Sequence, residues 1–425
     1  MLMRSLLIAF FAFVFFVGSL SRGLGQESTI LPLQKLIDEA LVKNRMLLTK
    51  KNQVGASKEK IPQAGTLPDP MLKLGVVNVP EALDFNDEPM TQKQISLSQK
   101  FPFPGKLGLA KEIVRRESNL SEAEFAYNQL EIINKVKNAY YTFFLIDKSI
   151  TVTEENKTIL ENFLEIARTR YAVGKGIQQD VMKAEVERSR MLEKLVMLKQ
   201  QKTTVIAQLN TFLDREPTAP LEGRPEVAFT PFTLEPEKIR TSSLEDHPLL
   251  QGTQFLQNKA ELAHRLALKD FYPDFEVSFA YGQREDAPNQ KSRPDFYSAF
   301  VGVNIPIWYK TKQSRKVEET QYTIFASENQ YETVKNDLQF KISSLLTEID
   351  QNSNLINLYQ DGIIPQSHQT LDSSLASYQV GTVDFLTLLT NFLTLFNSEL
   401  EYYRILTNYE KNLADLELSV GKRLF

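Results

Sequence analysis

Two stretches in the second half of the chain alternate apolar and polar residues. Residues 275–281 read Phe-Glu-Val-Ser-Phe-Ala-Tyr, and residues 297–305 carry Tyr, Ala, Val, Val and Ile at alternate positions. A two-residue period places the apolar side chains on one face of a β-strand. Phe296 and Phe300 interrupt the polar face of the second stretch. A polar, proline-containing loop joins the two, so the pattern predicts a β-hairpin over residues 275–307.

The first half of the chain carries a similar pair of stretches, which predicts a second hairpin over residues 71–101 with an acidic loop at 80–92. Each predicted strand is close to the ~9–11 residues that cross a bilayer as a tilted β-strand. Four strands cannot close a barrel alone, so strands that span a membrane would have to close with copies from other subunits. A soluble sheet covered by helices is the alternative, and the strands themselves do not decide between the two.

Long segments without turn residues follow each hairpin. Residues 106–172 and 311–378 are uninterrupted except at Pro365, and a chain of this length in helical form extends to ~100 Å at 1.5 Å per residue. After each segment the chain restarts with apolar residues spaced by three and four, which is typical of a coiled coil. Antiparallel helical hairpins are therefore predicted over residues 106–214 and 311–421. The predicted seam of the last helix consists of Leu386, Leu389, Leu393, Phe396, Leu400 and Tyr403, and that of the earlier return helix of Met191, Leu195, Leu198, Val205, Leu209 and Phe212, with Lys202 as its one polar member.

The two halves are copies of each other. Leu67-Pro68-Asp69 corresponds to Tyr272-Pro273-Asp274, and Phe101-Pro102 through Lys106 corresponds to Ile305-Pro306 through Lys310. Together with Asn44/His247 and Tyr171/Tyr378, these anchors keep a nearly constant displacement of 203 to 207 residues. We predict repeats over residues 26–214 and 242–425. The proline-rich segment 215–241 between them forbids a continuous helix and forms the linker.

The first 25 residues have the features of a secretory signal peptide. Arg4 precedes an apolar run from Leu6 to Val17, and small residues follow where a peptidase would cut. A membrane anchor is the alternative, but the run is shorter than the ~20 residues of a spanning helix. We therefore expect an exported protein.

Composition narrows the possible chemistry. The net charge is −4 over 425 residues, so no strong basic field is present and nucleic acid is not an expected partner. The absence of cysteine excludes disulfides, thiolate metal sites and thiol nucleophiles. Hydrolase and metalloprotease signatures and a phosphate-binding loop are also missing, and Glu261 with His264 is only half of a di-iron motif. His247 and His368 stand isolated, and we assign Met182, Met191 and Met197, as well as Tyr402, Tyr403 and Tyr409, to packing. We predict no enzyme activity, no cofactor and no metal site.

The order of these features resembles the TolC-like outer-membrane factor family, the exit ducts of efflux pumps and type I secretion systems in Gram-negative bacteria. The resemblance rests on the duplication, the strand pairs, the Tyr-x-x-Gly tips and Ile364-Pro365-Gln366, and it covers essentially the whole mature chain. Gln99-Lys100-Phe101-Pro102 and Gly105-Lys106 are similar to the strand exit of the heavy-metal efflux branch (cobalt-zinc-cadmium and copper-silver), although no residue identifies a metal cargo. The resemblance implies a mixed α+β, mainly α fold in which three protomers share a 12-stranded β-barrel and a periplasmic α-barrel.

The same resemblance implies a passive outer-membrane channel. Its partners would be two further copies in a homotrimer, a periplasmic adaptor, an inner-membrane transporter such as an RND pump, and outer-membrane lipid. The residues implied for adaptor contact are Arg168, Tyr171, Gly174, Lys175, Tyr378 and Gly381. Candidate gate residues are Asp180, Asp384 and Thr387, and an equal alternative is that the two aspartates only favour their helix N-termini. The alternative to a channel is a soluble periplasmic coiled-coil scaffold or adaptor, and an exported enzyme ranks third.

Overall fold

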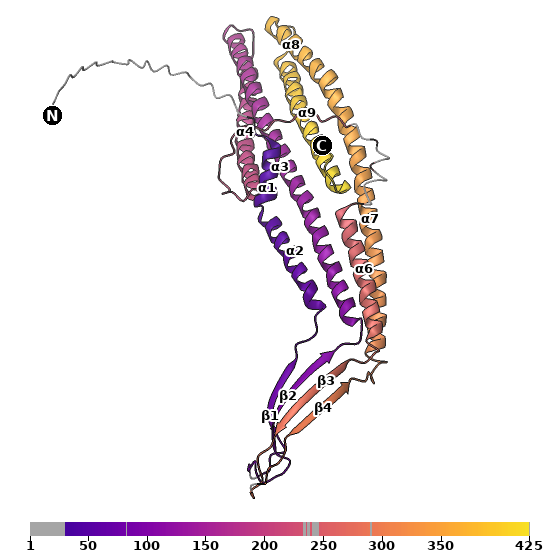
Figure 1. Cartoon of the computed structure of the whole chain (residues 1–425). Helices are drawn as coiled ribbons and strands as arrows, with labels where there is room; N and C mark the ends of the chain where they lie inside the picture. Colours follow the sequence, from indigo (N-terminus) through magenta and orange to yellow (C-terminus); the bar gives the residue numbers. More distant parts are fainter. Residues whose placement is uncertain are drawn as a thin grey trace, which may run out of the picture.

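The computed structural model describes residues 30–424, except residues 82, 233–234, 236–238, 240–245 and 290. The predicted signal peptide at residues 1–25 lies outside this part of the chain. The molecule is long and narrow (Figure 1). A small sheet lies at one end, and two turns between helices, at residues 173–177 and 381–384, lie at the other. None of the described helices combines the length and the apolar content needed to cross a membrane.

The four strands form one antiparallel sheet in the order β1-β2-β3-β4. Their bounds are Met71–Val77, Gln92–Phe101, Phe275–Gln283 and Phe296–Val303. Two hairpins from distant parts of the chain thus meet through β2 and β3, where Ser98 is opposite Ser278 and Leu97 is opposite Phe279. Among the described residues β1 pairs only with β2 and β4 only with β3.

The register gives the sheet one apolar face. Leu72, Leu97, Phe279 and Ala299 follow one another across the four strands on this face, and Leu72, Leu97 and Phe279 are more than half exposed. The other face carries Ser96, Ser98 and Ser278, with Lys100 opposite Glu276, as the alternation predicts, except that Phe296 and Phe300 also lie on it. An exposed apolar face of this extent needs a nonaqueous neighbour.

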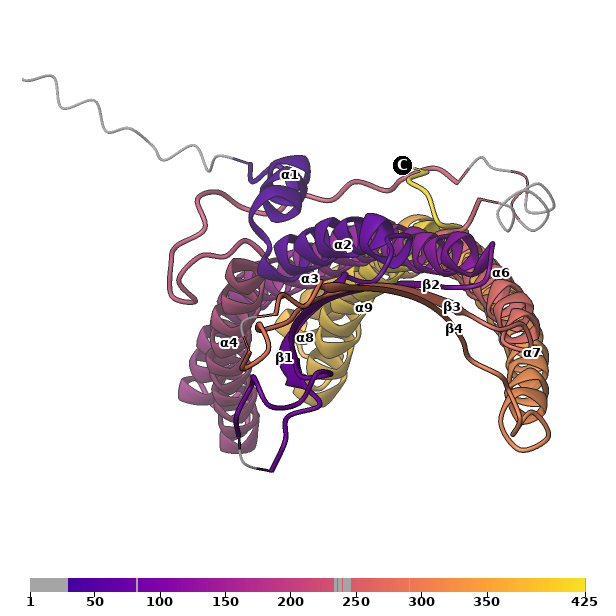
Figure 2. The ribbon, with the colours of Figure 1, turned by 60° about the horizontal axis from the view of Figure 1, so that its bottom comes forward.

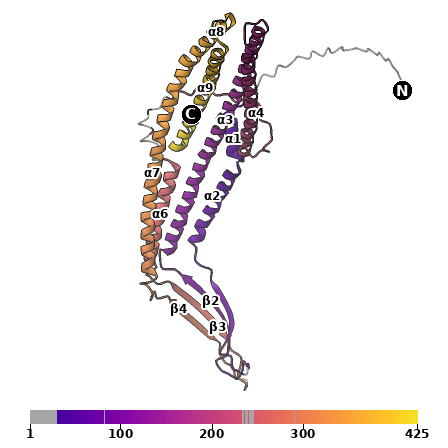
Figure 3. The ribbon, with the colours of Figure 1, turned by 180° about the vertical axis from the view of Figure 1, so that it is seen from behind.

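A layer of helices continues each strand in the same order. In Figures 1 and 3, α2, α3, α6 and α7 lie side by side beyond the sheet, and neighbouring members of this series are in contact. Figure 2 shows that sheet and helices curve in the same sense. The helices are α1 (Leu33–Lys43), α2 (Arg45–Ala64), α3 (Lys106–Ala172), α4 (Gln178–Phe212), α6 (Pro248–Lys269), α7 (Gln313–Leu358), η1 (Tyr359–Ile363), α8 (Ile364–Val380) and α9 (Phe385–Val420).

The expected break at Pro365 is a π-helical turn rather than an interruption. Residues 359–363 form η1, and the backbone stays right-handed from Leu358 through Ile364. Proline removes one N–H donor and clashes with the carbonyl four residues before it. A wider turn accommodates both effects, so α7, η1 and α8 form one continuous rod.

The predicted seam of α9 was only partly right. Leu389 and Phe396 are buried, but Leu386 is 53% exposed, and the fully buried stripe begins at Phe385, one residue earlier. The reason is that α9 contacts α3, α7 and α8, so a wider face than a two-helix seam must be apolar. The fully buried residues in the first half of α9 are Phe385, Leu388, Phe392 and Leu395.

Two lysines inside the helical layer are paired with carboxylates. Lys202, the polar member of the α4 seam, lies 2.5 Å from Asp147 and above the ring of Phe143. Nearer the sheet, Lys137 of α3 and Glu417 of α9 form an ion pair at 2.5 Å with both side chains less than 10% exposed. This pair ties the first repeat to the end of the second.

Replacing Lys137 with methionine should lower the free energy of unfolding by about 3 kcal/mol, because it removes the ammonium group that faces the buried Glu417 carboxylate. The double replacement K137M/E417M should recover part of this loss. The exposed pair Lys135–Glu131 provides the control, since K135M should change stability by less than about 1 kcal/mol. Thermal unfolding of the purified variants K137M, K137M/E417M and K135M measures these changes. An unchanged unfolding midpoint for K137M would show that the Lys137–Glu417 pair does not stabilise the fold.

Candidate functional site

The two helical turns farthest from the sheet have the same local geometry. Gly174 and Gly381 have φ of +71° and +84°, a conformation that glycine adopts without strain. In each turn the residue after the glycine donates its N–H to a carbonyl five positions back, from Lys175 to Arg170 and from Thr382 to Ser377. This is the Schellman ending of a helix, and it explains why the Tyr-x-x-Gly pattern occurs twice.

Arg170 connects the two turns. Its guanidinium donates to the carbonyl oxygens of Tyr378 at 2.5 Å and Gln379 at 2.8 Å, which are among the last carbonyls of α8. It also lies 4.8 Å from the centre of the Tyr378 ring. A positive charge at a helix C-terminus interacts favourably with the helix dipole. A β-carbon on Gly381 would approach Arg170 Nη2 to 3.1 Å, so a side chain there would displace the guanidinium by a few tenths of an ångström in addition to straining φ.

Sequence reasoning missed Arg170. The sequence feature that could have indicated it is a difference between the repeats. Arg170 precedes Tyr171, whereas Ser377, which cannot make such contacts, precedes Tyr378.

The residues predicted to contact an adaptor differ in their exposure. Tyr171 is 48% exposed, whereas Tyr378 is only 2% exposed, so the Tyr378 ring packs under Arg170 and does not belong to the outer surface. Arg168 forms ion pairs with Glu165 and Glu185 on the flank of the first hairpin. Gly174, Lys175 and Gly381 lie at the exposed surface.

The structure adds apolar residues that the sequence analysis did not single out. Val173, Ile177 and Val380 are between 58% and 76% exposed, and with Tyr171 they form an apolar cap on the two turns. An exposed apolar cluster rimmed by charged residues is typical of a protein contact surface.

The candidate gate residues lie just behind this cap. Asp384 is the N-cap of α9 and accepts a hydrogen bond from the Thr387 N–H at 2.8 Å. Hydrogen bonding by Thr387 lowers the pKa of Asp384. Asp384 therefore caps a helix N-terminus, as the alternative describes, and the Thr387 N–H completes the cap; this contact leaves open a further role of both residues at an entrance.

Asp180 occupies the first turn of α4 and senses Asp384 electrostatically. Partial burial raises the pKa of Asp180, and repulsion by Asp384 raises it further, while Lys183 and Arg170 act in the opposite direction. The fold therefore brings together the two aspartates, one from each repeat.

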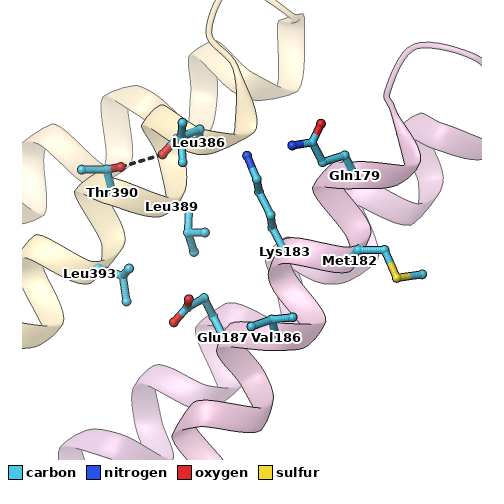
Figure 4. A pocket seen from close by; sticks show the side chains of 9 residues that line it. All are labelled: Gln179, Met182, Lys183, Val186, Glu187, Leu386, Leu389, Thr390 and Leu393. Carbon is cyan, nitrogen blue, oxygen red and sulfur yellow. Dashed lines mark hydrogen bonds between the residues drawn. The ribbon is translucent and has the colours of Figure 1, made fainter.

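A groove of about 430 Å³ runs between α4 and α9 behind the aspartates (Figure 4). Lys183 reaches from α4 toward α9, whereas the Met182 side chain points away from α9. Met182 lines this groove and is 54% exposed, and Met197 is 53% exposed, so of the three methionines assigned to packing only Met191 is buried in this chain. The lining residues are Gln179, Met182, Lys183, Val186, Glu187, Leu386, Leu389, Thr390 and Leu393.

No metal centre accompanies these features. Within the described ranges, no group of three or more His, Cys, Asp or Glu side chains could hold a metal ion. His264, half of the supposed di-iron pair, instead lies 3.0 Å from the hydroxyl of Thr320 and joins α6 to α7.

Comparison with known proteins identifies a family and relatives with the same architecture. The sequence profile of a family described as "Outer membrane efflux protein" matches residues 36–214 and 240–422. Outer membrane efflux protein BepC of Brucella suis biovar 1 (strain 1330) is 22% identical over 244 residues, which cover 57% of this chain and 53% of BepC. The match thus spans only about half the length of this relative.

Solved structures extend the similarity to nearly the whole fold. The outer membrane protein VceC from Vibrio cholerae superposes with a TM-score of 0.79 at 18% identity, covering 92% of this chain and 96% of VceC. The MtrE outer membrane channel of Neisseria gonorrhoeae gives 0.76 at 17% identity, covering 92% and 89%. The predicted fold class is confirmed.

Replacing Arg170 with methionine should loosen the second turn. Methionine preserves the apolar part of the side chain but removes the donors to Tyr378 and Gln379, a loss of about 2 kcal/mol for charge-assisted hydrogen bonds. We expect amide exchange over residues 377–382 to accelerate more than about tenfold, because local opening becomes easier. Hydrogen–deuterium exchange measured by mass spectrometry tests this, with R168M as the control. Equal exchange in R170M and wild type would show that Arg170 does not hold the turn.

Proposed function

The chain belongs to the outer membrane efflux protein family, and from this premise we propose that it is the passive exit duct of a tripartite efflux pump. It is an outer-membrane protein whose helices lie in the periplasm. The observation that carries the proposal is the four-stranded sheet, which has an apolar face and two edges that pair with no other described strand and is followed by long helical hairpins. Substrate would enter at the hairpin turns and leave through the sheet end, with energy supplied by the transporter.

Three copies would close the duct. In lipid every backbone N–H and C=O needs a partner inside the protein, so the free edges of β1 and β4 must meet β4 and β1 of neighbouring copies. Three four-stranded sheets then form a 12-stranded barrel, with the apolar faces toward lipid. In this arrangement residues 26–214 and 242–425 act as two successive wall units joined by the linker 215–241.

The apolar cap at the turns is the proposed contact surface for a periplasmic adaptor and, through it, an inner-membrane transporter such as an RND pump. Tyr171, Val173, Ile177 and Val380 supply its apolar part. Arg168, Gly174, Lys175 and Gly381 complete the surface, whereas Tyr378 acts beneath it.

Asp180 and Asp384 are the proposed electrostatic element of the entrance. Their side chains interact across the two hairpins of one chain, and three copies would place six carboxyl groups around the opening. Such rings favour cations and disfavour anions. Asp180, Asp384 and their described neighbours do not include a nucleophile together with an acid and a base. We therefore assign these residues a role in transport and none in catalysis.

A soluble periplasmic scaffold is the alternative, since it would share the coiled-coil hairpins. It does not account for the exposed apolar face of the sheet. We therefore expect the full-length protein to be recovered from outer-membrane fractions only with detergent, as a trimer by light scattering with detergent correction. A detergent-free monomer would support the scaffold instead.

Channel selectivity should depend on pH through the two aspartates. Because the pKa of Asp180 is raised and that of Asp384 is lowered, cation selectivity should fall in two steps as pH decreases, with Asp180 protonated first. D180N should remove the step at higher pH and reduce cation selectivity about twofold at pH 7. D384N should move that step to lower pH, because it relieves the repulsion that raises the pKa of Asp180.

Reversal potentials in planar bilayers under a KCl gradient measure these changes. Aspartate-to-asparagine replacement keeps the side-chain shape, and D286N in the loop between β3 and β4 serves as a control for a charge far from the turns. Identical pH profiles for wild type and D180N/D384N would exclude the aspartates as the selective element.

A further inference from the structure

The exit of β2 is locked to the second repeat by one aspartate. Asp274 accepts a hydrogen bond from the N–H of Phe103 at 2.7 Å, and the same oxygen lies 2.9 Å from the ammonium of Lys106. Beside it, the Phe103 ring stacks on Tyr272 with centroids 4.6 Å apart. This junction holds the first repeat against the second.

Because the chain is duplicated, the parts of this junction exist a second time, but they are apart. Asp69 corresponds to Asp274, and the exit of β4 through Lys310 corresponds to the exit of β2 through Lys106. Among the described residues the carboxylate of Asp69 and the ammonium groups of Lys310 and Lys312 are exposed and make no hydrogen bond or ion pair. Asp69 precedes β1 and Lys310 follows β4, so they lie at opposite edges of the same sheet.

The described helices beyond the sheet also have a contact in the first repeat that is missing in the second. Ser118 of α3 contacts Ser57 of α2, and Thr320 of α7 makes the equivalent contact with His264 of α6. Counted from these two contacts, Leu120 and Ala123 of α3 occupy the same positions as Tyr322 and Phe325 of α7. The contacts set this alignment, whose displacement of 202 residues is slightly smaller than at the sequence anchors.

Leu120 and Ala123 are covered by α6, since both lie within 4 Å of the place where a β-carbon on Gly252 would be. Tyr322 and Phe325 are 73% and 48% exposed. The helix that would cover them by analogy is α2, the first-repeat counterpart of α6, but the α2 of this chain lies at the other end of the layer (Figure 1).

We propose that a second copy of this chain supplies the missing half: Asp69 of one copy is bound by the Lys310–Lys312 turn of the next, and α2 of the first copy covers Tyr322 and Phe325. The contact has complementary charge and repeats a junction that the chain already makes with itself. This inference rests on the proposed trimer and names the residues at each contact between copies, here called the seam between copies. Three such seams close the ring.

Cross-linking tests the seam directly, because the chain contains no cysteine. In the detergent-purified variant D69C/K310C, a short bis-maleimide should join neighbouring copies and give covalent dimers and trimers on denaturing gels. A reagent is needed because an aspartate–lysine contact separates the backbones more than a disulfide tolerates. The control D84C/K310C has its two thiols at opposite ends of the sheet and should give no intermolecular product.

Charge reversal provides a second, independent readout. D69K should reduce the fraction recovered as trimer at limiting protein concentration about tenfold, because like charges then face each other at every seam. K310D/K312D should do the same, and the combined variant D69K/K310D/K312D should restore the trimer. E88K, an exposed change in the loop between β1 and β2, should have no effect.

The outcomes separate this proposal from the channel proposal. A trimer by light scattering that shows neither cross-linking in D69C/K310C nor rescue in D69K/K310D/K312D would overturn the seam and leave the channel intact. A wild-type monomer in detergent would overturn both. Cross-linking together with rescue would establish the seam.

Discussion

A sheet in a lipid bilayer must satisfy the hydrogen bonds of its outer strands, because no water is available to do so. In the described part of this chain β1 and β4 each have one edge without a neighbouring strand, while the register gives the sheet one continuous apolar face. These two features are compatible only if the sheet is one segment of a closed barrel. A wall segment of a ring would have the curvature that sheet and helices share (Figure 2). It would also have the matched order of strands and helices. The exposed Asp69 and Lys310 at its two lateral edges fit the same arrangement.

The duplication explains how one chain can build such a segment. Each repeat supplies a helix, a strand hairpin and a helical hairpin, and the second repeat packs on the first through Asp274, Lys106 and Phe103. The buried Lys137–Glu417 pair makes a second link farther along. A buried ion pair has a large desolvation penalty and is weak evidence for stability, so its role here is better understood as fixing the position of α9 on α3.

Local patterns were sufficient to predict most of the fold. The two-residue alternation indicated the strands, the absence of turn residues indicated helices as long as α3, and the paired Tyr-x-x-Gly sequences indicated the two turns. What could not be predicted depends on contacts between distant residues. His247 was regarded as isolated, yet it is fully buried, caps α6 through the N–H of Leu249, and contacts the carbonyl of Leu418. The stripe of α9 shifted because three helices surround it, and the burial of Tyr378 depends on an arginine 208 positions away in the sequence.

The repeats differ where they meet at the turns, and that difference determines which contacts each chain can make. Arg170 precedes Tyr171 in the first copy and reaches the last carbonyls of α8, whereas Ser377 precedes Tyr378 in the second copy. A serine side chain is too short to make the same contact, so among the described residues this link runs from the first hairpin to the second and not in the opposite direction. The two hairpins of one chain are therefore tied by a charged group at their turns.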